Sequence, residues 1–428
     1  MYTDGVEFEM SKNKIAWVLG AGFSAPLGGP MLKDLFSLAL HHEVSAMYKF
    51  TETTAYNPDV QYMDDVMWLY HYGRRFEQGR LTPWITSAVG NFQEPGEILW
   101  DHAEQFLEFL DSTFGSEVKR KRCLDIINLN PRRIGNKKLG DPLEVRKAAR
   151  RHLAGEVSYF LRDDTFERRL PYDRWANEVV GDEDVIITFN YDCVLERLHT
   201  VTETSSSPGR IKVLDSESLG TWPSGPKALK LHGGTSWVWE RDANDDWIVV
   251  TKYPEYAVRS YLQDEAKVIE AATIYVGTKE NRVRVSVPRH AYKKGEQAPG
   301  YLKEGGDVDL LVMATPGPSK YNNRSLKLWW DKASEFIKDA DAIVFIGYRF
   351  PPSDTHALKE LLTAIAGNSH PRLRLHTVLG PSLDDATVRL EQLLNYSAKS
   401  KDPTPIVEIH RLWAQDFMTV VRRCDLVG

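Results

Sequence analysis

A short apolar segment that runs directly into a glycine-rich turn constrains the fold of this chain more than any other feature. Residues 14–19 read Lys-Ile-Ala-Trp-Val-Leu, and residues 20–30 read Gly-Ala-Gly-Phe-Ser-Ala-Pro-Leu-Gly-Gly-Pro. The pattern of residues 31–40 then predicts a helix. A buried strand, a glycine turn and a helix form the first half of a doubly wound α/β unit.

Similar apolar segments recur later in the chain and predict further strands. They have the length and composition of strands that are covered on both faces, as in a parallel sheet. Helical periodicity fills most of the intervals between them. The expected strands are 185–188, 310–314, 342–346 and 374–379, and the expected helices are 97–114, 143–161, 322–337, 354–365 and 384–394. This alternation predicts an α/β fold with a Rossmann-like doubly wound parallel sheet.

Two long stretches interrupt the alternation. Residues 36–175 show helical patterns but no convincing strand, and they are too many for one crossover connection. Residues 238–304 contain short apolar segments, and residues 282–287 alternate strictly, as in a half-exposed antiparallel strand. We therefore expect a Rossmann-like domain built from residues 10–35, 176–237 and 305–428, with a large helical insertion at 36–175 and a small β-rich insertion at 238–304.

Composition excludes several classes of protein. The 428 residues carry a formal net charge of −6, which does not favour direct binding to nucleic acid. The three cysteines, Cys123, Cys193 and Cys424, cannot form a disulfide framework or a four-cysteine zinc site. We find no apolar run of membrane-spanning length and no signal-peptide pattern at the N-terminus, so we expect a cytoplasmic protein with no membrane contact.

The glycine turn matches the dinucleotide-binding fingerprint at Gly20, Gly22 and Ala25. A turn without side chains lets backbone N–H groups approach a pyrophosphate at a helix N-terminus, and the Ser24 hydroxyl can add to them. The same glycines also fit a tight turn with only a structural role. The acidic residue expected at the end of a second strand is missing, which disfavours an ordinary nicotinamide dehydrogenase.

The strand predicted at residues 185–188 ends in polar side chains. Thr188, Asn190 and Asp192 follow its apolar part, and ligands of open α/β sheets bind at the carboxyl ends of strands. The alternative is that Asn190 and Asp192 cap the helix expected at residues 193–198. Both interpretations remain open at this stage.

A second polar ending occurs at residues 229–235, where His232 precedes two glycines. This histidine can be a catalyst on a loop, or a structural residue with satisfied ring nitrogens. The chain has no Gly-x-Ser-x-Gly sequence, so the His-Gly-Gly run does not indicate an α/β-hydrolase oxyanion hole. It also lacks the phosphate-loop motif and the zinc-protease helix motif.

In combination, these segments resemble the sirtuin family. Gly20-Ala-Gly-Phe-Ser24, Thr188-Phe-Asn-Tyr-Asp192 and Leu231-His-Gly-Gly234 follow the order and spacing of its GAG-x-S loop, T-x-N-x-D segment and catalytic H-G. Residues 346–354, Ile-Gly-Tyr-Arg-Phe-Pro-Pro-Ser-Asp, are similar to a later strand and loop of the bacterial sirtuin-like branch, which meets the adenosine side of NAD. The resemblance spans nearly the whole chain outside the two insertions.

Two departures from the family pattern argue against protein deacylation. The four-cysteine zinc module is missing, and residues 29–32 replace the Asp-Phe-Arg type of segment that follows the first loop in deacylases. The remaining pattern resembles bacterial antiphage effectors that hydrolyse NAD⁺ to nicotinamide and ADP-ribose in abortive infection.

The resemblance also implies roles for individual residues. Asn190 would position the ribose and the water, His232 would be the base, and Asp192 would contact the ribose or orient its neighbours. Nicotinamide leaves as a neutral base, so the chemistry resembles glycoside hydrolysis and needs no metal. The implied contacts to NAD⁺ are Gly20, Ala21, Gly22, Phe23, Ser24, Thr188, Gly347, Tyr348 and Asp354.

An NADase that is always active would kill its host, so the resemblance implies control by homo-oligomerisation or by a partner such as a HerA-type ATPase or a prokaryotic Argonaute. The βα pattern continues to Val420, so we expect no separate C-terminal sensing domain. Arg349 could select the extra phosphate of NADP⁺ or simply be a surface arginine. Three other functions remain open: an ADP-ribosyltransferase or deacylase, a sensor that binds NAD or ADP-ribose without turnover, and an assembly scaffold.

Overall fold

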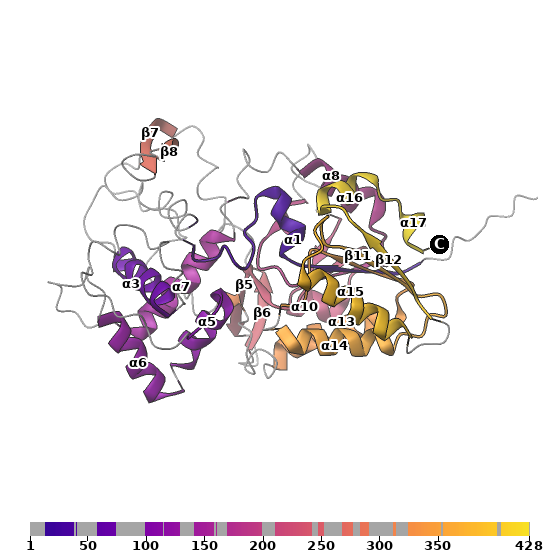
Figure 1. The fold of residues 1–428 in the computed structure, drawn as a ribbon, viewed down its shortest axis with the longest axis horizontal. Helices are drawn as coiled ribbons and strands as arrows, with labels where there is room; N and C mark the ends of the chain where they lie inside the picture. The colour runs from indigo at the N-terminus through magenta and orange to yellow at the C-terminus, as the bar shows by residue number, and fades with distance from the viewer. Residues whose placement is uncertain are drawn as a thin grey trace, which may run out of the picture.

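A seven-stranded, all-parallel sheet forms the centre of the computed structural model (Figure 1). Its order is β12-β11-β10-β1-β2-β4-β3. The strands are β1 (Ile15–Leu19), β2 (Val185–Thr188), β3 (Lys212–Val213), β4 (Lys227–Lys230), β10 (Ala342–Ile346), β11 (Arg374–Val378) and β12 (Ile406–His410). The structure describes residues 13–37, 40, 58–73, 99–113, 115–128, 141–157, 160, 169–198, 210–241, 247–251, 268–276, 283–290, 311–313, 324–351, 354–399 and 404–427.

The strand order confirms the predicted doubly wound fold. From β1 the chain builds one side of the sheet through β2, β3 and β4, and it later returns to β10 on the other side of β1. This reversal is a topological switch point, and its crevice lies at the carboxyl ends of β1 and β10. The glycine turn follows β1 at this point.

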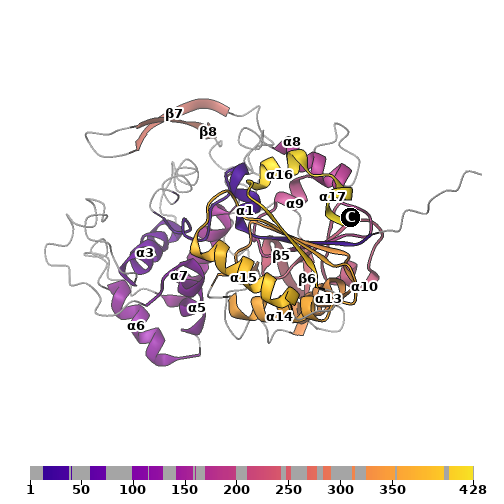
Figure 2. The same cartoon turned by 45° about the vertical axis from the view of Figure 1, so that its right-hand side comes forward.

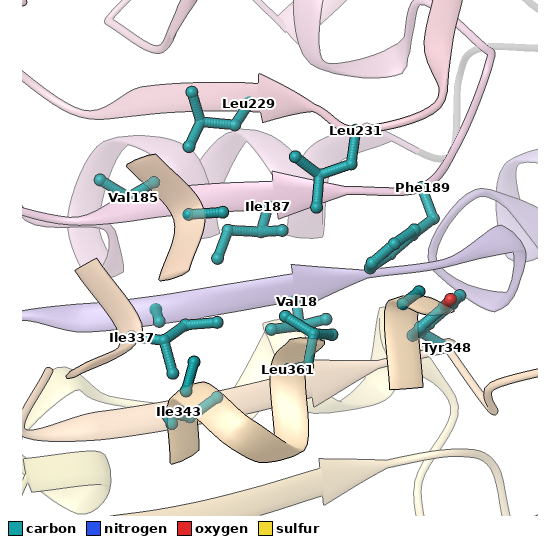
Figure 3. Packing of buried hydrophobic residues seen from close by; sticks show 14 of the residues in the cluster. Val18, Val185, Ile187, Phe189, Leu229, Leu231, Ile337, Ile343, Tyr348 and Leu361 are labelled. Atoms are coloured by element: carbon teal, nitrogen blue, oxygen red, sulfur yellow. The ribbon is translucent and has the colours of Figure 1, made fainter. Parts of the chain in front are cut away.

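Alternate residues of the central strands face opposite sides of the sheet, and each side packs against helices. Val18, Ile187 and Ile343 belong to one apolar cluster, part of which Figure 3 shows, and Trp17 and Val344 belong to a second. The first cluster includes residues of α13 (Arg324–Asp339), α14 (Thr355–Ala366) and α15 (Asp385–Lys399). The second includes residues of α8 (Leu170–Arg174), α9 (Val194–Arg197), α16 (Ala414–Val420) and α17 (Arg423–Val427), and Figure 2 shows the two helix layers on either side of the sheet.

A separate apolar cluster holds four helices together beside this sheet (Figure 1). They are α3 (Pro58–Gly73), α5 (Ala103–Ser112), α6 (Glu117–Asn128) and α7 (Pro142–Glu156). Two indole hydrogen bonds connect these segments. The indole N–H of Trp68 in α3 donates to the carbonyl of Ile126 in α6, and that of Trp100, just before α5, donates to the carbonyl of Tyr70 in α3. Tyr191, just beyond β2, also belongs to this cluster and connects it to the sheet. Within the described ranges, no helix combines the length and apolar character needed to cross a membrane.

Antiparallel strands form two smaller sheets. β5 (Gly233–Arg241) pairs with β6 (Trp247–Thr251) and with β9 (Leu311–Met313), and β7 (Val268–Val276) pairs with β8 (Val283–His290). The expectation that residues 310–314 form a strand of the parallel sheet is therefore wrong. An apolar run of five residues does not distinguish a parallel from an antiparallel strand, and β5 provides the pairing edge here.

The helix expected at residues 31–40 is wrong for residues 31–37, which are not helical, whereas residue 40 is helical. Helix α1 (Ala21–Ser24) instead begins inside the glycine segment, and a short 3₁₀ turn at Ala25–Leu27 continues it. Gly28 ends the turn at a φ of +101°, and residues 32–36 form further turns. The backbone N–H of Phe36 donates to the Glu156 carboxylate of α7 instead of to a helical carbonyl. Residues 38 and 39 lie outside the described part.

Candidate functional site

The glycine turn packs directly against the end of β10. The N–H of Gly20 donates to the carbonyl of Ile346 at 3.0 Å, and that of Gly22 donates to the carbonyl of Gly347 at 3.1 Å. A Cβ atom on Gly20 would lie 2.6 Å from Tyr348 Cα, and one on Gly22 would lie 2.7 Å from Gly347 Cα. The absence of side chains therefore permits a close approach of the two loops. This brings Gly347 and Tyr348 to the glycine turn, as a shared site would require.

Phe23 and Ala21, which belong to the same turn, differ in their surroundings. Phe23 is buried, with its ring edge-on to Tyr172 at 5.2 Å and to Trp175 at 5.5 Å. The Tyr172 hydroxyl donates to the carbonyl of Phe23 at 2.7 Å. Phe23 therefore anchors α1 to the helices on one face of the sheet, whereas Ala21 is only half-buried.

Asn190 connects the end of β2 to the glycine turn. Its side-chain Nδ2 donates to the carbonyl of Gly20 at 3.0 Å and to Ser24 Oγ at 3.1 Å. Its backbone N–H donates to Thr188 Oγ1 at 3.1 Å. Among the described residues, nothing donates a hydrogen bond to Asn190 Oδ1. The amide is thus held by its nitrogen, and its oxygen remains able to accept a hydrogen bond from a ligand.

Asp192 holds Ser24 and the first turn of α9. The Ser24 hydroxyl donates to Asp192 Oδ2 at 2.7 Å, and the N–H of Val194 donates to Oδ1 at 3.0 Å. Burial raises the pKa of the Asp192 carboxyl, although the N–H of Val194 and the Lys230 ammonium oppose this rise. Asp192 therefore holds the start of α9 from the residue before its N-cap, Cys193, whereas the Asn190 side chain bonds to the glycine turn instead. The contact with Asp192 also commits the hydroxyl proton of Ser24 to a carboxylate and not to a phosphate.

A buried ion pair lies behind Asp192. Lys230 Nζ is 2.6 Å from Glu196 Oε1 and donates to the carbonyl of Asp192 at 2.6 Å. Burial is the largest single influence on the pKa of Lys230 and lowers it. Glu196, Cys193 and Asp192 together outweigh burial, so the pKa is raised overall. Sequence reasoning missed this pair, since neither residue belongs to a recognisable motif. The pair fixes the backbone from which the site's polar side chains project.

His232 forms a second polar group with Tyr348, two residues after β10, and Asp354, the N-cap residue of α14. Its Nε2 lies 3.0 Å from Asp354 Oδ2, and the same oxygen accepts a 2.6 Å hydrogen bond from the Tyr348 hydroxyl. Asp354 is fully buried and His232 nearly so. The family resemblance implied that Tyr348 and Asp354 contact the cofactor. In the structure Asp354 Oδ2 lies beside the predicted base, and the Tyr348 hydroxyl donates to that oxygen.

Aromatic rings enclose His232. Phe189 stacks on Tyr348 with ring centroids 3.9 Å apart, a contact visible in Figure 3, and lies edge-on to His232 at 4.9 Å. The rings of Tyr191 and Trp330 lie 6.2 and 6.4 Å from His232. The Tyr191 hydroxyl also donates to Glu104 of α5 at 3.3 Å. The helical cluster therefore contributes directly to the wall around the histidine.

Arg349 belongs to a structural contact. Its guanidinium forms an ion pair with Asp384 and donates to the carbonyl of Leu379 at 2.5 Å. Asp384 in turn accepts the N–H of Thr387 at the start of α15. These contacts favour the structural alternative for Arg349 over recognition of an additional phosphate.

The implied catalytic and NAD⁺-contacting residues lie at or beyond the carboxyl ends of the four neighbouring strands β4, β2, β1 and β10, with Asp354 at the N-cap of α14. One group contains Asn190, Ser24 and Asp192, the other contains His232 and Asp354, and Tyr348 lies beside both. Comparisons with protein-family models and with curated protein sequences find no match.

Proposed function

We propose that the chain is an NAD⁺ glycohydrolase that converts NAD⁺ and water to nicotinamide and ADP-ribose. The observation that carries this proposal is that Asn190 and His232 follow the neighbouring strands β2 and β4 at the carboxyl edge of the sheet, with Asn190 bonded to the glycine turn and His232 paired with Asp354. Open α/β sheets bind nucleotides in the crevice at their carboxyl edge. An amide oxygen, an imidazole paired with a carboxylate, and a glycine turn together provide what this hydrolysis needs.

The proposed chemistry assigns a separate task to each group. Cleavage of the nicotinamide bond develops positive charge at C1′ of the ribose, and a water molecule adds there. Asn190 Oδ1 accepts a hydrogen bond from a ribose hydroxyl or from this water. His232 accepts the proton that the water loses, and the adjacent Asp354 carboxylate stabilises the protonated ring. Ser24 and Asp192 act through Asn190 by holding its amide in place.

The hydrogen-bond donors available to the NAD⁺ pyrophosphate differ from those of the usual dinucleotide-binding fingerprint. The N–H groups of Gly22 and Phe23 already donate to Gly347 and Gly20 within the chain. The Ser24 hydroxyl likewise donates to Asp192. We therefore assign the N–H of Ala21, at the start of α1, as the backbone donor of this turn for a phosphate oxygen.

We further propose that this activity depletes NAD⁺ in a bacterial antiphage abortive-infection response, under the control of oligomerisation or of a partner protein. The resemblance to the bacterial sirtuin-like branch supports this role. The hydrogen bond from Tyr191 to Glu104 adds a physical connection, because it couples α5 of the helical cluster to the wall around His232. A partner or second copy that contacts these helices would act on the site through it.

The test is to incubate the purified chain with NAD⁺ over a range of protein concentrations and to measure nicotinamide and ADP-ribose by chromatography. We expect both products in equal amounts, and we expect Asn190→Ala and His232→Ala to abolish them. Asn177→Ala is a matched control, because the side chain of this exposed asparagine donates to the carbonyl of Asp173 in the adjoining helix α8, away from the site. NAD⁺ that binds but is never cleaved, in vitro or in cells that produce the chain, would indicate a sensor and overturn the proposal.

A further inference from the structure

Three potential metal ligands lie together on the two strands at the β12 edge of the sheet. His376 on β11 is paired with Glu408 on β12, and Val378 is paired with His410. Because side chains alternate along a strand, Glu408 and His410 lie on the same face. Strands β10 and β1 separate this cluster from Asn190 and the end of β2. The cluster is therefore distinct from the site proposed above.

The donor atoms of the cluster are spaced as ligands of one ion. His376 Nδ1 lies 3.1 Å from His410 Nε2 and 3.9 Å from Glu408 Oε2, and all three atoms fall within 4.8 Å of one another. Zinc–nitrogen bonds of 2.0–2.1 Å in a tetrahedral site place neighbouring donors about 3.3 Å apart. The two imidazoles already match this spacing. Glu408 is partly exposed, so its carboxylate has room to close the remaining gap.

The surrounding groups also orient the donor atoms. His376 Nε2 lies 3.0 Å from the carbonyl oxygen of Leu426, which can only accept a hydrogen bond. The proton of His376 is therefore on Nε2, and the lone pair of Nδ1 faces His410. A backbone carbonyl behind a ligating imidazole is the usual arrangement in metal sites. Glu408 Oε1 lies 3.2 Å from the Arg374 guanidinium, which leaves Oε2 for the cluster.

We propose that His376 Nδ1, His410 Nε2 and Glu408 Oε2 bind one divalent transition-metal ion of the zinc type. Imidazole nitrogen with a carboxylate oxygen is a ligand set that suits Zn²⁺, and water completes the fourth position. The bound ion fastens the edge strand β12 to β11. Through the contact of His376 with Leu426 it also stabilises the attachment of α17, which Figure 1 shows beside these strands.

The alternative interpretation is that these three side chains bind no ion. In that case His410 Nε2–H donates a hydrogen bond to His376 Nδ1, and the 3.1 Å contact is explained by the two imidazoles alone. Only the first possibility predicts stoichiometric binding of a metal ion that depends on Glu408 as well as on the two histidines, so a binding measurement distinguishes the two.

The test uses the full chain, freed of any purification tag and of metal by a chelator, titrated calorimetrically with Zn²⁺ alone. We expect one ion per chain, a Tm that rises with Zn²⁺, and visible d–d absorption when Co²⁺ is substituted. His410→Ala and Glu408→Gln change half-buried positions and should each lower the affinity at least about tenfold. His370→Ala is the matched control, since this half-buried histidine before β11 pairs with Asp341 instead.

Two results would overturn the proposal. One is the absence of stoichiometric Zn²⁺ binding by the folded, metal-free chain. The other is binding whose affinity is the same in His410→Ala, Glu408→Gln and the unchanged chain. Neither readout depends on hydrolysis of NAD⁺, so failure of this proposal and failure of the proposed function are distinguishable.

Discussion

Asp354 places a carboxylate oxygen 3.0 Å from Nε2 of His232; His232 follows strand β4, and Asp354 is the N-cap residue of α14. The same oxygen accepts the hydroxyl of Tyr348 at 2.6 Å. A buried carboxylate beside an imidazole both orients the ring and stabilises its protonated form. This pairing supports a positioning role for Asp354 toward the proposed base.

Replacing Asp354 with Asn tests that role. Asparagine keeps the size of the side chain but removes the negative charge, so the protonated form of His232 loses its stabilisation. We expect kcat for NAD⁺ hydrolysis to fall roughly 100-fold, with a much smaller change in KM. Steady-state kinetics measures both constants. Tyr348→Phe removes only a hydroxyl from the same oxygen and should cost far less, and a kcat for Asp354→Asn equal to that of the unchanged chain would contradict the assignment.

The packing of the glycine turn against β10 predicts a large effect of Gly347→Ala. Gly347 has a φ of +66°, and a Cβ atom there would lie 2.3 Å from the carbonyl carbon of Gly22. We expect the free energy of unfolding to fall by more than about 2 kcal/mol, as measured by urea denaturation. Gly220→Ala is the control, because a Cβ atom at Gly220 meets no atom within 4 Å. Equal stabilities of the two variants would show that the close approach is not present.

Ser24→Ala removes the link between Asp192 and Asn190. The change deletes a hydrogen bond from each of them and leaves the buried Asp192 carboxylate with one fewer donor. We expect a loss of about 1–3 kcal/mol in the free energy of unfolding, together with slower hydrolysis of NAD⁺. Ser369→Ala, at an exposed serine, should change stability by less than about 0.5 kcal/mol. A variant that retains full stability would mean that Ser24 does not hold this network.

Asp173 gives a prediction about pH. Burial raises the pKa of its carboxyl to about 6, although Arg169 opposes the rise. When the pKa of a carboxyl is higher in the folded than in the unfolded protein, protonation favours the folded state. This contribution to stability is fully present at a pH below both pKa values. That contribution is lost as the pH rises from the ordinary Asp range near 4 to about 6. Urea denaturation across this window should therefore show a smaller decline in stability for Asp173→Asn than for the unchanged chain, and parallel curves would contradict the prediction.

Much of the fold could be predicted from local patterns. The apolar run ending at Leu19 and the one at residues 342–346 have the composition of buried parallel strands, and both are central in the sheet. Residues 310–314 have the same composition, but their described part, β9, pairs antiparallel with β5, because strand direction depends on a distant partner. Residues 31–37 of the helix expected at 31–40 are not helical for a similar reason, since Glu156 of α7 takes the N–H of Phe36.

The sequence motifs predicted which residues belong to the candidate site, but they did not predict which of these residues contact one another. The motifs singled out Asn190 and His232, and the fold brings both to one edge of the sheet. The pairing of His232 with Asp354 and the ion pair of Lys230 with Glu196 depend on how separate strand ends meet. Spacing along the chain carries no information about such contacts.

The most direct test of the central claim is chromatographic measurement of NAD⁺, nicotinamide and ADP-ribose after incubation with the unchanged chain, Asn190→Ala and His232→Ala. The account predicts that the unchanged chain releases nicotinamide and ADP-ribose in equal amounts and that neither variant does. Release by either variant at the rate of the unchanged chain would contradict it. So would NAD⁺ that stays intact with the unchanged chain at every protein concentration and in cells that produce it.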